Sequence, residues 1–131
     1  MAFVFSQRSL NNLKGVHPKL VAVMTKALEY TEYDYTITEG LRSYERQVQL
    51  KAEGKSKTLK SYHLKQSDGY GHAVDVVALV PQPNGKSTIS WDEKYYWKIN
   101  EAVQKAAAEV GVKITAGVTW GWDCPHFQIE L

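Results

Sequence analysis

Apolar residues recur at helical spacing in two segments of the chain. The first segment begins at Pro18, a residue well suited to the first turn of a helix. Its apolar positions are Leu20, Val21, Met24, Ala27 and Leu28. The second segment follows Ser90 and Glu93, which together predict a capping box, and it ends at Gly111. Its apolar positions are Tyr96, Ile99, Val103, Ala106 and Val110. Each segment predicts a helix with one buried face.

Four other segments have the composition of strands. Asp34–Thr38 is rich in β-branched and aromatic residues, and Ala73–Val80 is apolar apart from a single carboxylate. Pro81–Gly85 predicts a turn after the second of these strands. Two short strands are predicted near Val112–Thr115 and at His126–Ile129.

A third helix and a loop are predicted between the first two strands. Ser43 can cap a helix that ends at Gly54, and Lys55–Tyr70 has no periodicity. The order helix, strand, helix, strand, helix, strand, strand predicts an α+β fold. We expect a single domain over residues 1–131, with a small, mainly antiparallel sheet and helices packed on one side of it. The connections also allow a parallel pair, so the strand order stays open.

Composition excludes several classes of protein. The net charge is only +2, and the sixteen Lys and Arg residues are spread along the chain, so no nucleic-acid partner is predicted. No apolar run approaches the length of a membrane span. Cys124 is the single cysteine and cannot form an internal disulfide. The first residues lack the pattern of a secretory signal, so we expect synthesis in a reducing cytosol. A monomer is the default expectation.

Two histidines and two carboxylates suggest a catalytic metal site. Asp75 interrupts an apolar strand, and a buried carboxylate needs a cation or strong donors. His126 begins the last strand, with Asp123 three residues upstream, within reach of a water held on a metal at His126. Together with His63 in the preceding loop, these residues make the ligand set of a catalytic zinc site with one open position, plus a general base. A salt bridge at Asp75 and a structural role for His126 are the alternatives.

His72 is the rival to His63 as a ligand, since it is closer to Asp75 in sequence. On a strand, however, residues 72 and 75 point to opposite faces, which disfavours that pair. His17, just before a helix, is interpreted as a cap or surface residue. Cys124 is not counted as a ligand, because its adjacency to Asp123 would strain the geometry.

Other residues suit the binding of a substrate. Arg42 lies where a strand meets a helix, and an arginine there can hold a carboxylate or a developing oxyanion. Pairing with Glu39 or Glu45 is the alternative. Trp120 and Trp122 flank the proposed site in sequence and form either the wall of a substrate cleft or part of the core.

Several motifs taken together resemble those of one family. They are Phe5–Leu10, Gly15–Val21, Thr36–Gln47, Gly54–His63, Gly71–Val76 and Asp123–Gln128. The combination resembles the phage-type L-alanyl-D-glutamate peptidases. These small zinc endolysins are related to D-alanyl-D-alanine carboxypeptidases and dipeptidases.

The resemblance implies roles for individual residues. His63, Asp75 and His126 correspond to the ligands of one Zn²⁺ ion, and Asp123 corresponds to the catalytic base. By the same resemblance, Arg42 helps to bind substrate and stabilise the oxyanion, and Ser61 supports the site. The implied reaction is hydrolysis of the L-Ala–D-Glu bond in the stem peptide of bacterial peptidoglycan. An endolysin made in the host cytoplasm would reach the wall through separate lysis machinery.

The chain departs from the family pattern at three places. Leu64–Tyr70 lengthens the gap between His63 and Gly71 by about five residues, forming an inserted loop. Tyr62 stands where many relatives carry arginine, which alters substrate contacts. Ala116–Trp122 is short, which leaves less of a lid over the cleft. A D,D-carboxypeptidase and a non-catalytic wall-binding module are the alternative functions, and no residue identifies the target bacterium.

Overall fold

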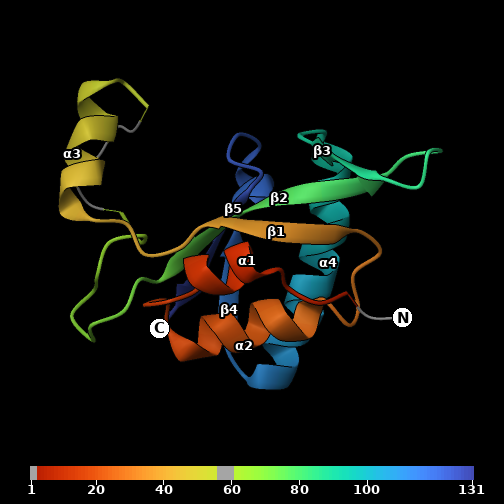
Figure 1. Ribbon diagram of the computed structural model, residues 1–131. Coiled ribbons are helices and arrows are strands. Elements are labelled where there is room, and N and C mark those ends of the chain that lie inside the picture. Colours follow the sequence, from red (N-terminus) through yellow and green to blue (C-terminus); the bar gives the residue numbers. More distant parts are fainter. Residues whose placement is uncertain (1–2, 56–60) are drawn as a thin grey trace.

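Five strands form one antiparallel sheet in the computed structural model, which describes residues 3–55 and 61–131 (Figure 1). The strands are β1 (Asp34–Glu39), β2 (Ala73–Pro81), β3 (Ser87–Ser90), β4 (Lys113–Ala116) and β5 (His126–Glu130). Their order is β1-β2-β5-β4, and β3 pairs with β2. Every pairing between these strands is antiparallel, which settles the order that the sequence leaves open.

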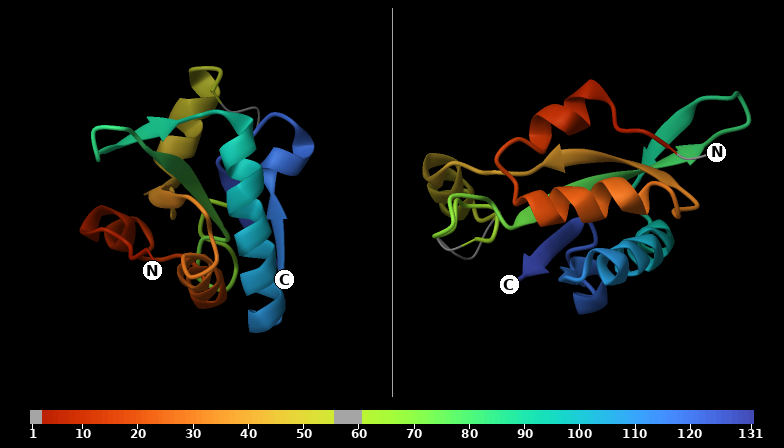
Figure 2. Two further views of the ribbon diagram at one scale, coloured as in Figure 1. Left: turned by 90° about the vertical axis from the view of Figure 1, so that its right-hand side faces the viewer. Right: turned by 90° about the horizontal axis from the view of Figure 1, so that it is seen from below.

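In the described part of the chain, four α-helices and one 3₁₀ helix accompany the sheet. They are α1 (Gln7–Asn12), α2 (Pro18–Ala27), α3 (Tyr44–Ala52), α4 (Glu93–Val110) and η1 (Gly117–Trp120). Helix α2 packs against α4, whereas α3 stands apart from both (Figures 1 and 2). The α+β prediction, with a small antiparallel sheet, is confirmed.

The hydrophobic core joins α2 and α4 to one face of the sheet. Alternate residues of β2 and β5 enter this core, namely Val74, Val76, Ala78, Phe127 and Ile129. Because neighbouring residues of a strand point to opposite faces, Asp75 and His126 lie on the other face. The core packing of the two strands thereby places two polar site residues on the side away from α2 and α4.

Most predicted elements occur close to their predicted bounds. Pro18 begins α2, Ser43 caps α3 through a hydrogen bond to the Arg46 amide, and Gly111 ends α4 in a left-handed conformation. The loop predicted over residues 55–70 includes residues 56–60, which lie outside the described residues. Within the described part of the chain, no helix is long and apolar enough to cross a membrane.

The predicted capping box of α4 is wrong. Asp92 is the N-cap, because its side chain accepts from the Lys94 amide at 3.2 Å. Ser90 instead ends β3, and its hydroxyl accepts from the Asp92 amide. Pro81, predicted within the turn, is the last residue of β2. Helix α1 and strand β3 were not predicted from the sequence.

Candidate metal centre and active site

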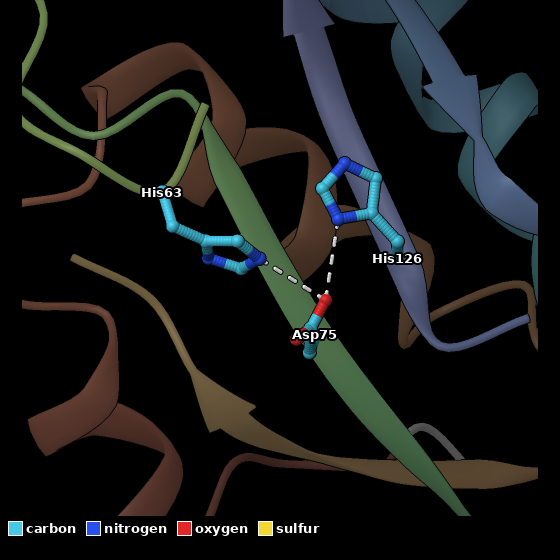
Figure 3. Close-up of side chains that lie close together, drawn as sticks. All are labelled: His63, Asp75 and His126. Atoms are coloured by element: carbon cyan, nitrogen blue, oxygen red, sulfur yellow. Dashed lines mark hydrogen bonds and ion pairs between the residues drawn. The ribbon is translucent and has the colours of Figure 1, made fainter. Parts of the chain in front are cut away.

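His63, Asp75 and His126 form a group in which one ligand atom of each lies within 4.8 Å of the others (Figure 3). Asp75 and His126 are direct partners in the antiparallel register of β2 and β5. Residues paired in this way share a face of the sheet, so the register itself brings the two side chains together. His63 reaches them from the loop that precedes β2.

The spacing of these atoms suits zinc. Asp75 Oδ1 lies 3.2 Å from His63 Nε2 and 3.3 Å from His126 Nδ1. Two ligands held at ordinary zinc distances with a tetrahedral angle are roughly 3.3 Å apart. Two imidazoles and one carboxylate are also a donor set that zinc prefers, with one coordination position left for water or substrate. The three residues therefore fit a catalytic zinc ion.

A backbone carbonyl orients the His63 ring. Its Nδ1 lies 2.9 Å from the Gly40 carbonyl oxygen, which must accept, so the single proton of the neutral ring sits on Nδ1 and Nε2 is free for a metal. A Cβ atom at Gly40 would overlap the backbone carbonyl of Asn12, so this strand end needs glycine. Ser61, the predicted supporting residue, accepts from the His63 amide at 3.1 Å. The His63 side chain is 3% exposed and firmly packed.

A polar chain along β5 orients His126. Its Nε2 lies 2.8 Å from Gln128 Oε1, and Gln128 Nε2 donates to Glu130 Oε1 at 2.6 Å. The second carboxylate oxygen of Glu130 accepts from the Tyr62 hydroxyl at 3.3 Å. Tyr62, the neighbour of His63, thus ties the two sides of the centre together. Gln128 and Glu130 were not predicted as site residues. The sequence feature that indicates them is the alternation of polar residues with apolar ones along this short strand, which puts both on the same face as His126.

The charges within the group stabilise one another. Burial alone would raise the pKa of Asp75, but in the metal-free protein the hydrogen bonds and positive charges of His126 and His63 in their protonated forms outweigh burial and hold that pKa well below its usual range. Burial alone would lower the pKa of His126, but the hydrogen bond and the charge of Asp75 raise it above the usual histidine value. Asp75 therefore favours a positive charge beside it, either on a protonated histidine or on a metal ion.

Asp123 lies beside this group. Its Oδ2 is 3.9 Å from His126 Nδ1. Burial raises the pKa of Asp123, and the positive charge of His126 opposes that effect only in part. A carboxylate with a raised pKa can accept a proton and release it again, as a general base must. A Cβ atom at Gly117 would overlap the Asp123 carbonyl, so η1 packs directly against the backbone of this residue.

Arg42 forms an ion pair with Glu39, which was the alternative interpretation of this residue from the sequence. Its Nε donates to Glu39, and its Nη1 donates to Gln47 at 2.6 Å and approaches the Ser61 hydroxyl at 3.5 Å. The side chain is 11% exposed, and its charge lowers the pKa of Asp123. Arg42 is thus close enough to Asp123 to act on its charge, and Glu39 and Gln47 hold the guanidinium in position.

His72 lies outside the metal group. Its Nε2 is 2.8 Å from Asp68, a residue of the inserted loop. Asp68 also lies 3.7 Å from His17, whose Nδ1 caps α2 by accepting from the Lys19 amide. The loop over residues 64–70 is therefore fastened to the body of the protein, and His63, not His72, faces Asp75.

The two predicted tryptophans lie beside His126. Trp120 is 5.5 Å from His126 between ring centroids, and Trp122 stacks on Trp120 at 5.6 Å. Both are exposed, which excludes the interpretation that they belong to the core. Cys124 is partly buried and has no place in the metal group formed by the described residues.

Comparisons with known proteins agree with this geometry. A family model described as phage L-alanyl-D-glutamate peptidase matches residues 1–129. The L-alanyl-D-glutamate peptidase of Escherichia phage T5 is 34% identical over 122 residues, which cover 92% of this chain and 83% of that protein. The crystal structure of the Serratia marcescens L-Ala D-Glu endopeptidase ChiX matches with a TM-score of 0.81 and 43% identity, over 98% of this chain and 91% of that one. With a family model that spans nearly its whole length, the chain belongs to the phage L-alanyl-D-glutamate peptidase family.

Proposed function

We propose that this protein is a zinc-dependent endolysin that hydrolyses the L-Ala–D-Glu bond of peptidoglycan stem peptides. The observation that carries the proposal is the convergence of His63, Asp75 and His126, with Asp123 beside them, in a chain of this family. The relatives named above cleave this bond, as their names state.

The residues of the site have separate tasks in this reaction. His63, Asp75 and His126 would hold zinc, which when bound activates water and polarises a carbonyl. Asp123 takes a proton from the attacking water and passes it to the leaving nitrogen of D-Glu. The raised pKa of Asp123 suits both transfers. Arg42 contributes positive charge near the developing oxyanion, while Glu39 and Gln47 hold its guanidinium in place.

We further propose that the enzyme is made in the cytoplasm of the host bacterium and reaches the wall through separate lysis machinery. A phage peptidase of the wall needs to act only at the end of infection, when its release destroys the host. Fractionation of infected cells before and after membrane permeabilisation tests this location.

Mass spectrometry of digested peptidoglycan tests the reaction. Purified Gram-negative peptidoglycan is incubated with the protein alone, with a chelator, and with chelator followed by excess zinc. We expect fragments with a new amine on D-Glu, their loss with chelator and their return with zinc. Free D-Ala as the product would indicate a D,D-carboxypeptidase instead. Binding to the wall without any product would indicate a non-catalytic module.

A further inference from the structure

Trp120 and Trp122 form an exposed aromatic surface that the hydrophobic core does not use. Their rings stack with centroids 5.6 Å apart and an angle of 26° between planes. Trp120 is 40% exposed and Trp122 is 75% exposed. Between them, Gly121 has a φ of 82°, a left-handed conformation that turns the chain so that the second ring can lie on the first. An indole left this exposed gains little from folding and is available to a ligand.

This surface is continuous with the metal centre. The rings of His126, Trp120 and Trp122 follow one another at centroid distances of 5.5 and 5.6 Å. Trp120 is tilted by 32° from the His126 ring. A ligand group lying on the tryptophans would therefore be joined to a bond at the metal centre by a link of only one or two residues.

The proposed substrate has such a group on one side of its scissile bond. In peptidoglycan, L-Ala is joined through a lactyl group to the sugar N-acetylmuramic acid, and D-Glu lies on the other side of the bond. One residue spans about 3.8 Å, so the sugar begins within roughly 8 Å of the scissile carbonyl. The C–H face of a pyranose is apolar and flat enough to pack on an indole ring.

The surroundings of the two histidines differ as the two sides of the scissile bond do, with polar groups next to His63 and aromatic rings next to His126. Arg42 and Ser61 lie next to His63, because the Arg42 amide donates to the His63 carbonyl and the Ser61 hydroxyl accepts from the His63 amide. Their polar groups suit the free carboxylate of D-Glu. The His126 side carries the aromatic surface. This asymmetry orients the stem with its D-Glu toward Arg42 and its sugar toward Trp122.

We propose that Trp120 and Trp122 bind the N-acetylmuramic acid of the glycan strand, so that the enzyme selects stem peptides still attached to sugar. This inference rests on the function proposed above. If the sugar covers roughly 50–60 Å² of the apolar indole surface, the affinity for the substrate that carries it increases about tenfold.

Two synthetic substrates test the proposal on the zinc-loaded enzyme. One is a disaccharide tetrapeptide, and the other is the N-acetyl tetrapeptide, which keeps the amide on L-Ala and lacks the sugar. We expect kcat/KM of the wild type to be about tenfold higher for the disaccharide substrate. Trp122→Ala lowers this ratio to near one, and Trp122→Phe, which keeps a flat ring, retains part of it.

Trp97→Ala is the matched control, because it removes a 44% exposed indole from α4. It keeps the wild-type ratio. A ratio near one in the wild type, or a wild-type ratio in Trp122→Ala, would overturn the sugar-binding surface while leaving the peptidase intact. Failure of the wild type to cleave either substrate would instead overturn the proposed function.

Discussion

His126 Nε2 donates to Gln128 Oε1 at 2.8 Å, and this hydrogen bond leaves Nδ1 of the same ring facing Asp75 Oδ1 at 3.3 Å. Gln128 can accept only because its own amide nitrogen donates to Glu130 at 2.6 Å, which fixes the orientation of the amide. A neutral imidazole has one N–H, so Gln128 decides which nitrogen is free for a metal.

We therefore expect Gln128→Leu to weaken zinc binding by about 10- to 100-fold, the usual effect of losing the partner of a ligating histidine. Competition with a chromogenic chelator measures the affinity. Nitrogen NMR of the metal-free protein should show His126 losing its preference for the Nε2–H tautomer. Gln49→Leu makes the same chemical change on the exposed face of α3 and should leave both measurements unchanged. Unchanged zinc affinity in folded Gln128→Leu would contradict the role of Gln128.

The stabilisation expected from the proposed zinc ion should depend on pH. In the metal-free protein the pKa of His126 is raised above its usual value of 6.5. Its contribution to the stability of that form is therefore complete below the usual value and is lost as the pH rises through the raised pKa. Zinc needs neutral His126, so acid favours the metal-free form and competes with the metal. Asp75, whose pKa is lowered, stays charged while the histidines take up protons.

We expect the increase in Tm on adding zinc to shrink as the pH falls from about 8 to about 6, through the histidine range. Thermal unfolding with zinc and with chelator, at a series of pH values, measures it. His72→Gln removes a histidine outside the metal group and should keep the same dependence. An equal gain in Tm at both ends of this range would show that no histidine ligand competes with protons.

Local patterns predict the elements that pack into the core. The spacing of Leu20 and Met24 in α2, and of Ile99 and Val103 in α4, reflects one buried face in each helix. Strand β3 was missed because most of its residues are exposed and polar. Helix α1 was missed because its only buried residue is Ser9, whose hydroxyl accepts from the Ile37 amide at the edge of β1.

The identities of the candidate site residues follow from residue type and family pattern, but their arrangement does not. Asp75 and His126 are neighbours because of strand register, which depends on pairing across 51 positions of sequence. His63 faces Asp75 because the Gly40 carbonyl holds its ring, a contact that no local pattern reveals. Gln128 acquires its role only once His126 is in place.

Gly117 should be needed for the position of Asp123. A Cβ atom at Gly117 would overlap the Asp123 carbonyl, so Gly117→Ala must displace the backbone that carries the proposed base. We expect kcat to fall about 100-fold, as for a misplacement of about 1 Å, while zinc stays bound. Metal content and steady-state kinetics on a stem peptide measure the two effects. Gly85→Ala, in the turn between β2 and β3, is the control for replacing a glycine and should keep the wild-type kcat, because a Cβ atom there meets no neighbour within 4 Å. A normal kcat in Gly117→Ala would contradict the packing argument.

Asp123→Asn separates catalysis from metal binding. Asparagine keeps the size of the side chain but cannot accept the proton of the attacking water, so we expect kcat to fall by about 10²- to 10⁴-fold. Zinc content should stay at the wild-type level, because His63, Asp75 and His126 make up the metal group without Asp123. Asp68→Asn, in the inserted loop, is the control and should keep full kcat. Turnover at the wild-type rate in zinc-loaded Asp123→Asn would mean that another group accepts the proton, and loss of zinc from this variant would make Asp123 part of the metal site.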